Sequence, residues 1–175
     1  MALLHIIKYG NPILRMKAEP IQEITAEHKQ LAADMIQTMQ ANDGIGLAAP
    51  QVAQSIQMIV VDYGLVVKGE APQAFINPEI MEDEGSLTME EGCLSVPELH
   101  EEVTRAERIR VKYQNIDGEP VDEWLDGVKA RVVQHEVDHL KGIFFVDRIS
   151  SNRKKSIKKD LRNIAQEELS TQNAA

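Results

Sequence analysis

The chain has 175 residues, of which 43% are hydrophobic and 27% are charged, and this length is sufficient for one compact domain with a buried core. The formal net charge of -9 argues against a general nucleic-acid-binding protein, because binding to phosphates requires a positive field. The single cysteine excludes an internal disulfide, and the apolar run near the N-terminus is too short for a signal sequence or a membrane span. We therefore expect one cytoplasmic domain over residues 1–175 that binds neither DNA nor a membrane.

In chain order, the first predicted elements are a short strand, a helix and an irregular segment. The strand covers residues 3–7. The helix begins after the N-cap residue Thr25 and extends to about Gln40, because apolar residues recur at helical spacing and Asn42-Asp43-Gly44 follows. Residues 44–51 contain two glycines and a proline, which favours a shaped loop or an irregular edge strand.

Four further segments have the apolar runs or the alternation that is typical of β-strands. They comprise residues 58–62, 74–76, 108–113 and 121–125. We expect Asn77-Pro78 to end the second of them and Asp117-Gly118 to form a hairpin between the last two. Nine acidic residues without any Lys or Arg lie from Glu79 to Glu102, and we interpret most of them as solvated faces and turns.

Two more helices are predicted in the last third of the chain. The first follows Asp126 as its N-cap and ends near Leu140, and the second covers about 154–169. Together with the strands, they predict an α+β fold in which antiparallel β-sheets surround a central helix that carries an HExxH motif. One helix in the N-terminal half and one C-terminal helix complete this fold class.

The central helix contains His135-Glu136-Val137-Asp138-His139, the HExxH pattern of metal-dependent hydrolases. Residues four positions apart lie on one face of a helix, so His135 and His139 can bind one metal ion at about 2.0–2.1 Å. Glu136 lies close enough to act on water at that ion without being a ligand. Bulky aliphatic neighbours indicate that this turn is buried, where His and Glu without partners would be costly.

A catalytic metal site needs a third protein ligand and an open position. Downstream of the motif, Glu167 and Glu168 have suitable spacing but lie at the far end of the last helix. Upstream, Cys93 follows Gly92 in a polar, acidic segment, although a lone cysteine is more often an inert core residue. The sequence favours Cys93 and leaves the two carboxylates as alternatives.

Three blocks of the sequence resemble the peptide deformylases. They are Gly44-Ile45-Gly46-Leu47-Ala48-Ala49-Pro50-Gln51, Glu91-Gly92-Cys93-Leu94-Ser95 and Gln134-His135-Glu136-Val137-Asp138-His139. The blocks occur in the order and at the spacing of that family, and the resemblance covers nearly the whole chain. The short C-terminal helix and the lack of large insertions resemble the bacterial type with a helical tail.

The resemblance implies that Cys93, His135 and His139 bind one divalent metal ion and that Glu136 is the general base and acid. Ferrous iron would be the native ion, while zinc, nickel or cobalt could also occupy this ligand set. The substrate would be the N-formyl-methionyl end of a nascent chain. Hydrolysis would release formate and a free amino terminus.

The resemblance also implies contacts with the substrate. The Gln51 side chain and the Leu94 backbone N–H would face the developing oxyanion. Ile45 and Gly46 would pair with an extended substrate backbone, and Gly92 would lie beside it. Aliphatic residues of the motif regions could line a methionine pocket or could simply belong to the core; they are Ile45, Met89, Val128 and Val132.

Several neighbours of these blocks have weaker interpretations. Asp138 and Gln134 are expected either to support the ligands from behind or to be structural, whereas Arg131 has no evident role. His100 stands where family members often carry Arg or Tyr near the mouth of the cleft, and we expect it at the surface. The basic run at 153–159 could dock the last helix on the ribosome, and solvated lysines on a packed helix explain it equally well.

Three other functions remain compatible with the motif alone. A general HExxH endopeptidase would cleave unblocked peptides internally and would not need Cys93. A Cys/His nucleophilic hydrolase would stay active after metal chelation. A metal-holding scaffold without activity would give no reason for Glu136 or for an open cleft.

Overall fold

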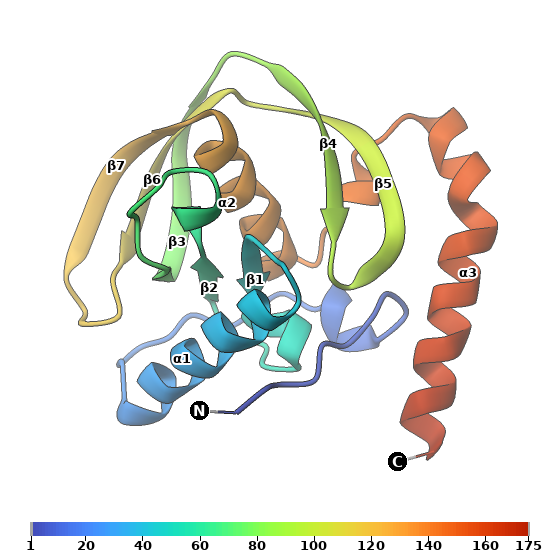
Figure 1. The fold of residues 1–175 in the computed structure, drawn as a ribbon, viewed down its shortest axis with the longest axis horizontal. Helices are drawn as coiled ribbons and strands as arrows, with labels where there is room; N and C mark the ends of the chain where they lie inside the picture. Colours follow the sequence, from blue (N-terminus) through green and yellow to red (C-terminus); the bar gives the residue numbers. More distant parts are fainter. Residues whose placement is uncertain (1, 175) are drawn as a thin grey trace.

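The computed structural model describes residues 2–174, in which three α-helices and seven β-strands form an α+β fold (Figure 1). The strands form a five-stranded sheet in the order β1-β2-β3-β6-β7 and a separate two-stranded sheet, β4-β5. All paired strands are antiparallel. The strand bounds are Gly46–Ala48 (β1), Met58–Val61 (β2), Gln73–Glu84 (β3), Leu87–Cys93 (β4), Val96–Arg105 (β5), Arg108–Gln114 (β6) and Pro120–Asp126 (β7).

Helix α2 (Gly127–Leu140) lies at the centre, between the five-stranded sheet and the β4-β5 hairpin (Figure 1). Its valines Val132, Val133 and Val137 are buried in a cluster with side chains of β2, β3 and β6. This packing holds the HExxH turn rigidly against the sheet. The predicted fold class, with antiparallel sheets around the central helix, is confirmed.

Helix α1 (Ala26–Ala41) covers a second cluster of buried side chains, to which it contributes Met35 and Met39. Alternate residues of β2 face the two clusters: Ile59 belongs to the α2 cluster, whereas Val60 belongs to the α1 cluster. A strand with period-2 alternation and apolar residues on both sides is buried on both faces. The predicted helix and the predicted buried strand are therefore both present.

Residues 3–7 do not form the predicted strand. The Ile7 N–H donates to the Gln51 carbonyl oxygen at 2.9 Å, and the Tyr9 N–H donates to that of Ser95 at 2.8 Å. Gln51 lies in a 3-10 helix and Ser95 lies in a turn, so these bonds cannot extend into a ladder with a neighbouring strand. The apolar character of the segment reflects the burial of Ile6 and Ile7 in the core.

Asn77-Pro78 does not end a strand, because β3 continues to Glu84. Asn77 adopts a left-handed conformation with φ 51°, and the register of β3 against β6 shifts between Ile76 and Glu79. This bulge accommodates the proline, which has no N–H to donate to the ladder.

The β4-β5 hairpin is absent from the sequence-based prediction. Its strands are joined by Leu94 and Ser95, neither of which is the Gly or Asn that signals a tight hairpin turn. The acidic residues of this segment are exposed except Glu91 and Glu101, which are buried and form ion pairs. The interpretation of most of these acidic residues as solvated is therefore confirmed, and Glu91 and Glu101 are the two exceptions.

Helix α3 (Ser151–Ala174) is longer than the predicted 154–169 and lies along the outer side of β5 (Figure 1). Ile157 is buried, and Leu161 and Ile164 pack against the same cluster, so the predicted apolar stripe is what attaches the helix. Arg153 adds an ion pair to Glu101 of β5 at 2.7 Å.

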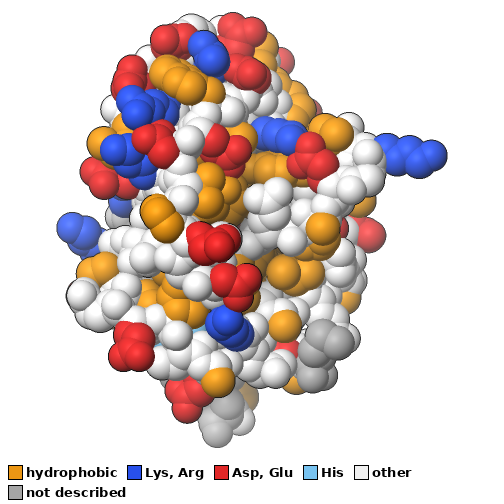
Figure 2. Space-filling model, turned by 90° about the vertical axis from the view of Figure 1, so that its left-hand side faces the viewer, with side chains coloured by type: hydrophobic (Ala, Val, Ile, Leu, Met, Phe, Trp, Pro, Cys, Tyr) orange, Lys and Arg blue, Asp and Glu red, His pale blue; other side chains and the backbone are white. Residues whose placement is uncertain are grey.

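Charged side chains of both signs lie on the five-stranded sheet, where Arg110 of β6 pairs with Glu82 of β3 at 2.7 Å and with Asp122 of β7 at 2.8 Å. Figure 2 shows basic and acidic side chains interleaved over one face of the molecule. Across residues 2–174, no helix is both long enough and apolar enough to cross a membrane.

Candidate functional site

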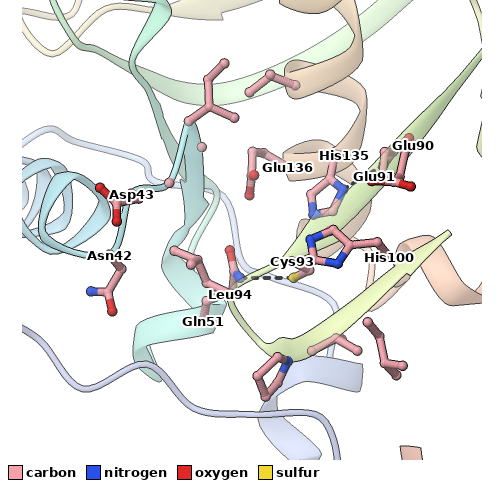
Figure 3. A pocket seen from close by; sticks show the side chains of 18 of the residues that line it. Asn42, Asp43, Gln51, Glu90, Glu91, Cys93, Leu94, His100, His135 and Glu136 are labelled. Atoms are coloured by element: carbon pink, nitrogen blue, oxygen red, sulfur yellow. Dashed lines mark hydrogen bonds and ion pairs between the residues drawn. The ribbon is translucent and has the colours of Figure 1, made fainter. Parts of the chain in front are cut away.

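A cleft of about 570 Å³ lies between β1, the β4-β5 turn and α2 (Figure 3). Most of the residues singled out in the sequence line this cleft; they are Ile45, Gly46, Gln51, Met89, Gly92, Cys93, Leu94, His100, Val128, Arg131, Val132, His135 and Glu136. Glu167 and Glu168 lie elsewhere, on α3. Glu168 is buried there and accepts a hydrogen bond from the Asn11 side chain at 3.0 Å, while Glu167 is exposed.

Cys93, His135 and His139 form a group whose ligand atoms all lie within 4.8 Å of one another. The Cys93 Sγ lies 3.3 Å from His139 Nε2. Bonds of about 2.0–2.3 Å in a tetrahedral zinc-type site place neighbouring ligand atoms about 3.3–3.8 Å apart. The donor set therefore fits a single metal ion with small movements of the side chains. The two histidines come from successive turns of α2, and the cysteine is the last residue of β4.

Glu91 fixes the orientation of His135. Its Oε1 lies 2.8 Å from His135 Nδ1, which leaves Nε2 of this ring for a metal ion. A carboxylate behind a histidine is the usual support of a metal ligand. Burial lowers the pKa of His135, but hydrogen bonds with Cys93 and Glu91 outweigh it and raise this pKa well above its ordinary value. A cation at Nε2 would replace the second proton of the ring.

His139 is buried more deeply than His135, and burial lowers its pKa well below the ordinary value. The neutral imidazole is the form that binds metal ions. Its Nδ1 has no hydrogen-bond partner among residues 2–174. His139 is thus held in the protonation state that a metal ligand requires.

A buried ion-pair network lies behind the three candidate ligands. Arg105 donates to Glu91 at 2.7 Å and to Asp138 at 2.8 Å, so it joins β5 to β4 and α2. Arg131 donates to Glu91 at 2.6 Å, and Arg148 donates to Asp138 at 2.5 Å. Burial would raise the pKa of Glu91, but hydrogen bonds from His135 and Arg105 outweigh it and lower this pKa to about 2. Glu91 is therefore an anion within the network.

The contacts in and around this network show what several residues bind whose roles the sequence analysis left open. Asp138 supports the motif helix, as expected, through Arg105 and Arg148. Arg131, which had no evident role, binds Glu91 and the backbone carbonyl of Val103. Gln134 lies outside the network and donates to backbone carbonyl groups, so its support is local to α2 and the β5-β6 connection.

Glu136 is 4% exposed and points into the cleft (Figure 3). Its Oε2 has no hydrogen-bond partner within the described part of the chain. Burial raises the pKa of Glu136 to about 7, and a cation beside it would favour the carboxylate. Strand β1 approaches this side chain so closely that a Cβ atom on Gly46 would lie 2.5 Å from Glu136 Oε1. A side chain at position 46 would therefore displace the Glu136 carboxylate.

Gln51 is 2% exposed, and its amide is fixed at both ends. Oε1 accepts from the Ala48 N–H at 2.9 Å, and Nε2 donates to Ser95 Oγ at 3.1 Å. The same Nε2 lies 3.5 Å from Cys93 Sγ, a weak acceptor, so one of its two protons is directed towards the metal group. Leu94 follows Cys93 in the hairpin turn and lines the cleft. Ser95 was not singled out by the sequence.

The four aliphatic residues considered for a methionine pocket all line the cleft, and Val132 also belongs to the core. His100 is exposed, as expected, and its ring covers Gly92 at the cleft mouth. A Cβ atom on Gly92 would lie 2.7 Å from that ring. Gly92 therefore leaves room for His100 rather than for a larger side chain of its own.

Comparisons with known proteins agree with this geometry. A family model for polypeptide deformylase matches residues 3–155. The chain is 47% identical over 158 residues to a peptide deformylase of Thermotoga maritima, and the match covers 90% of this chain and 93% of that protein.

Crystal structures of relatives superpose on nearly the whole chain. A peptide deformylase from Thermus thermophilus matches with a TM-score of 0.87 and 40% identity over 95% of this chain and 99% of that one. A peptide deformylase from Synechococcus elongatus in complex with actinonin matches with a TM-score of 0.84 and 39% identity over 89% and 86% of the two chains. The chain therefore belongs to the polypeptide deformylase family, the metal-dependent hydrolases that remove the formyl group from the N-terminus of nascent chains.

Proposed function

We propose that this chain removes the formyl group from N-formyl-methionyl ends in the cleft between β1, the β4-β5 turn and α2, and that it does so in the cytoplasm. The observation that carries the proposal is a Cys/His/His group beside the buried carboxylate of Glu136. Membership of the deformylase family argues against the endopeptidase, the Cys/His hydrolase and the scaffold.

Cys93, His135 and His139 would hold one divalent metal ion, which acts as a Lewis acid and makes water nucleophilic at neutral pH. Glu136 takes a proton from the attacking water as general base. Water adds to the formyl carbon, and the C–N bond then breaks. Glu136 delivers the proton to the departing nitrogen, so the products are formate and a free amino terminus.

The oxyanion that develops on the formyl oxygen needs donors that are already in place. Gln51 Nε2 would supply one of them from the 3-10 helix after β1, and the Leu94 backbone N–H would supply the other from the β4-β5 turn. Because the Gln51 amide is fixed by Ala48 and Ser95, it needs no reorganisation during the reaction.

The substrate backbone would extend along β1, the edge strand of the five-stranded sheet. Ile45 and Gly46 would pair with it, and Gly92 would border it on the opposite wall. The methionine side chain would enter the apolar part of the cleft between Met89 and Val128. A thioether chain fits such a site because it is flexible and apolar.

Ferrous iron is our proposal for the native ion. One thiolate and two imidazoles form a donor set that also accepts zinc, cobalt or nickel. We expect anaerobically prepared protein to release formate from a formyl-methionyl peptide, to lose this activity with a chelator, and to recover it when ferrous ion is added back. Formate and metal content should be measured on the same samples.

Two controls decide this prediction. An unblocked peptide of the same sequence should remain intact, because it has no formyl group to lose. Internal cleavage of that peptide would instead indicate an endopeptidase, and formate release that persists in protein stripped of metal would contradict the metal-dependent mechanism.

We also propose that α3 docks the enzyme on the ribosome. Lys154, Lys155, Lys158 and Arg162 line a basic groove of about 380 Å³ together with Tyr9. Cations in this arrangement suit the phosphates of ribosomal RNA. The helix itself is attached through Ile157 and through the ion pair of Arg153, so its attachment does not use the four basic residues that line the groove.

Charge reversal tests the docking, because deletion of the helix would expose the buried side of Ile157. The variant Lys155→Glu/Lys158→Glu should lose co-sedimentation with ribosomes and keep its rate on a free peptide. The control Lys17→Glu/Lys68→Glu changes two exposed lysines elsewhere by the same charge. Unchanged co-sedimentation of the α3 variant would rule the docking out.

A further inference from the structure

The segment Ile7–Tyr9, which we call the N-terminal brace, runs beside the two elements that carry Gln51 and Leu94. We infer that Lys8 is a positioning residue of this enzyme, which holds the Leu94 turn in the geometry that its N–H needs to face the oxyanion. The inference rests on the proposed function, because it assigns Lys8 a role through the proposed donors.

Backbone bonds attach the brace to both elements. The Ile7 N–H donates to the Gln51 carbonyl oxygen at 2.9 Å, and the Tyr9 N–H donates to the Ser95 carbonyl oxygen at 2.8 Å. Lys8 lies between these two attachment points. Its backbone position is therefore set by the same residues that form the oxyanion side of the cleft.

Ser95 closes the connection between the two elements. Its hydroxyl donates to the Ile7 carbonyl oxygen at 2.8 Å and accepts from Gln51 Nε2 at 3.1 Å. Ser95 is fully buried, so solvent does not compete for these bonds. Displacement of the brace would move Ser95 and, with it, the Gln51 amide.

The Lys8 side chain contacts the Leu94 turn directly. Its Nζ donates to the Leu94 carbonyl oxygen at 2.8 Å, and the residue lines the cleft. This bond fixes the peptide that follows Leu94 and keeps the negative end of its carbonyl directed at the ammonium. Without it, the Leu94–Ser95 peptide would lose this anchor, and the two peptides that meet at the Leu94 Cα could shift together and move the Leu94 N–H out of line.

Partial burial of the Lys8 ammonium group costs free energy of solvation, which the contact with the Leu94 carbonyl oxygen offsets. Lys8 is partly buried, and burial lowers the pKa of its side chain, while Cys93 and Glu168 partly offset this effect. Lysines usually keep the charged end in water. The charge is instead held beside a backbone carbonyl at the edge of the reaction site.

Two variants of Lys8 test the inference on the full chain. Lys8→Met removes the donor and the charge, and Lys8→Arg keeps both. Loss of an entire oxyanion donor costs about 10²–10³ in kcat, and misalignment of one should cost about tenfold. We expect Lys8→Met to lower kcat by about tenfold with KM and metal content unchanged, and Lys8→Arg to recover most of the rate.

The control Lys17→Met makes the same chemical change at an exposed lysine that forms no side-chain hydrogen bond or ion pair within residues 2–174, and it should behave as wild type. Amide hydrogen exchange at Leu94 and Ser95 gives a readout that does not depend on turnover. Faster exchange in Lys8→Met, reversed in Lys8→Arg, supports positioning.

A kcat of Lys8→Met equal to that of wild type would overturn the inference. If KM is higher at this unchanged kcat, Lys8 is instead a substrate-binding residue. The variant Gln51→Leu, measured in parallel, separates failure of the Lys8 inference from failure of the proposed function. If that variant and wild type release formate equally fast, the oxyanion assignment itself is wrong, whatever Lys8 does.

Discussion

Replacement of Glu136 by Gln should lower the turnover of a formyl-methionyl peptide by several orders of magnitude while the metal content stays unchanged. Glutamine has the same shape as the buried carboxylate but cannot accept a proton from water. General acid–base catalysis contributes about 10²–10⁴-fold for each group, and Glu136 serves in both halves of the proposed reaction. Because it is not one of the Cys/His/His ligands, its loss should leave the metal bound.

Single-turnover formate release and metal analysis on the same preparation would check this expectation. Glu27→Gln is the matched control, since it makes the same change at an exposed glutamate on α1. Near-normal turnover by Glu136→Gln with its metal retained would eliminate Glu136 as the base. Loss of both metal and activity would show that the carboxylate acts on the ligands instead.

Replacement of Glu91 by Gln should weaken metal binding and destabilise the fold at the same time. The Glu91 carboxylate binds His135, Arg105 and Arg131 in a site where it is 7% exposed. Removing its charge leaves Arg131 without a buried counter-ion, although Arg105 still has Asp138. Breaking a buried ion pair in this way costs about 3–5 kcal/mol of stability.

The effect on the metal follows from the bond between Glu91 and His135 Nδ1. Loss of a carboxylate behind a ligating histidine lowers metal affinity by about 10–100-fold. Chelator competition and urea unfolding measure the two effects separately, and Glu102→Gln on the exposed side of β5 is the control. If Glu91→Gln unfolds at the wild-type urea concentration and keeps its affinity, the network has no part in either property.

The elements that sequence predicted are those with local signals. Helix α2 could be placed because Asp126 precedes an apolar, periodic run, and His135 and His139 follow from the helical repeat alone. Cys93 could be singled out as a candidate ligand because it follows Gly92 in a polar, acidic segment. In each case the information lies within a few neighbouring residues.

The features that sequence did not predict depend on contacts between distant segments. The β4-β5 hairpin turns at Leu94 and Ser95 without a glycine, because Gln51 and the Ile7 carbonyl hold the turn from outside. Glu91 resembled its solvated acidic neighbours, and its burial depends on Arg105 and other distant cations. No local pattern distinguishes such a glutamate from an exposed one.

The close approach of Gly46 to Glu136 limits which substitutions can make this enzyme resistant to an inhibitor that fills its cleft. Any side chain at position 46 would collide with the carboxylate, because even a Cβ atom would lie 2.5 Å from Oε1. A substitution here that excluded the compound would also displace the proposed base. Drug resistance through added bulk at position 46 would therefore sacrifice the reaction, and resistant variants should arise instead at the rim, where His100 is exposed.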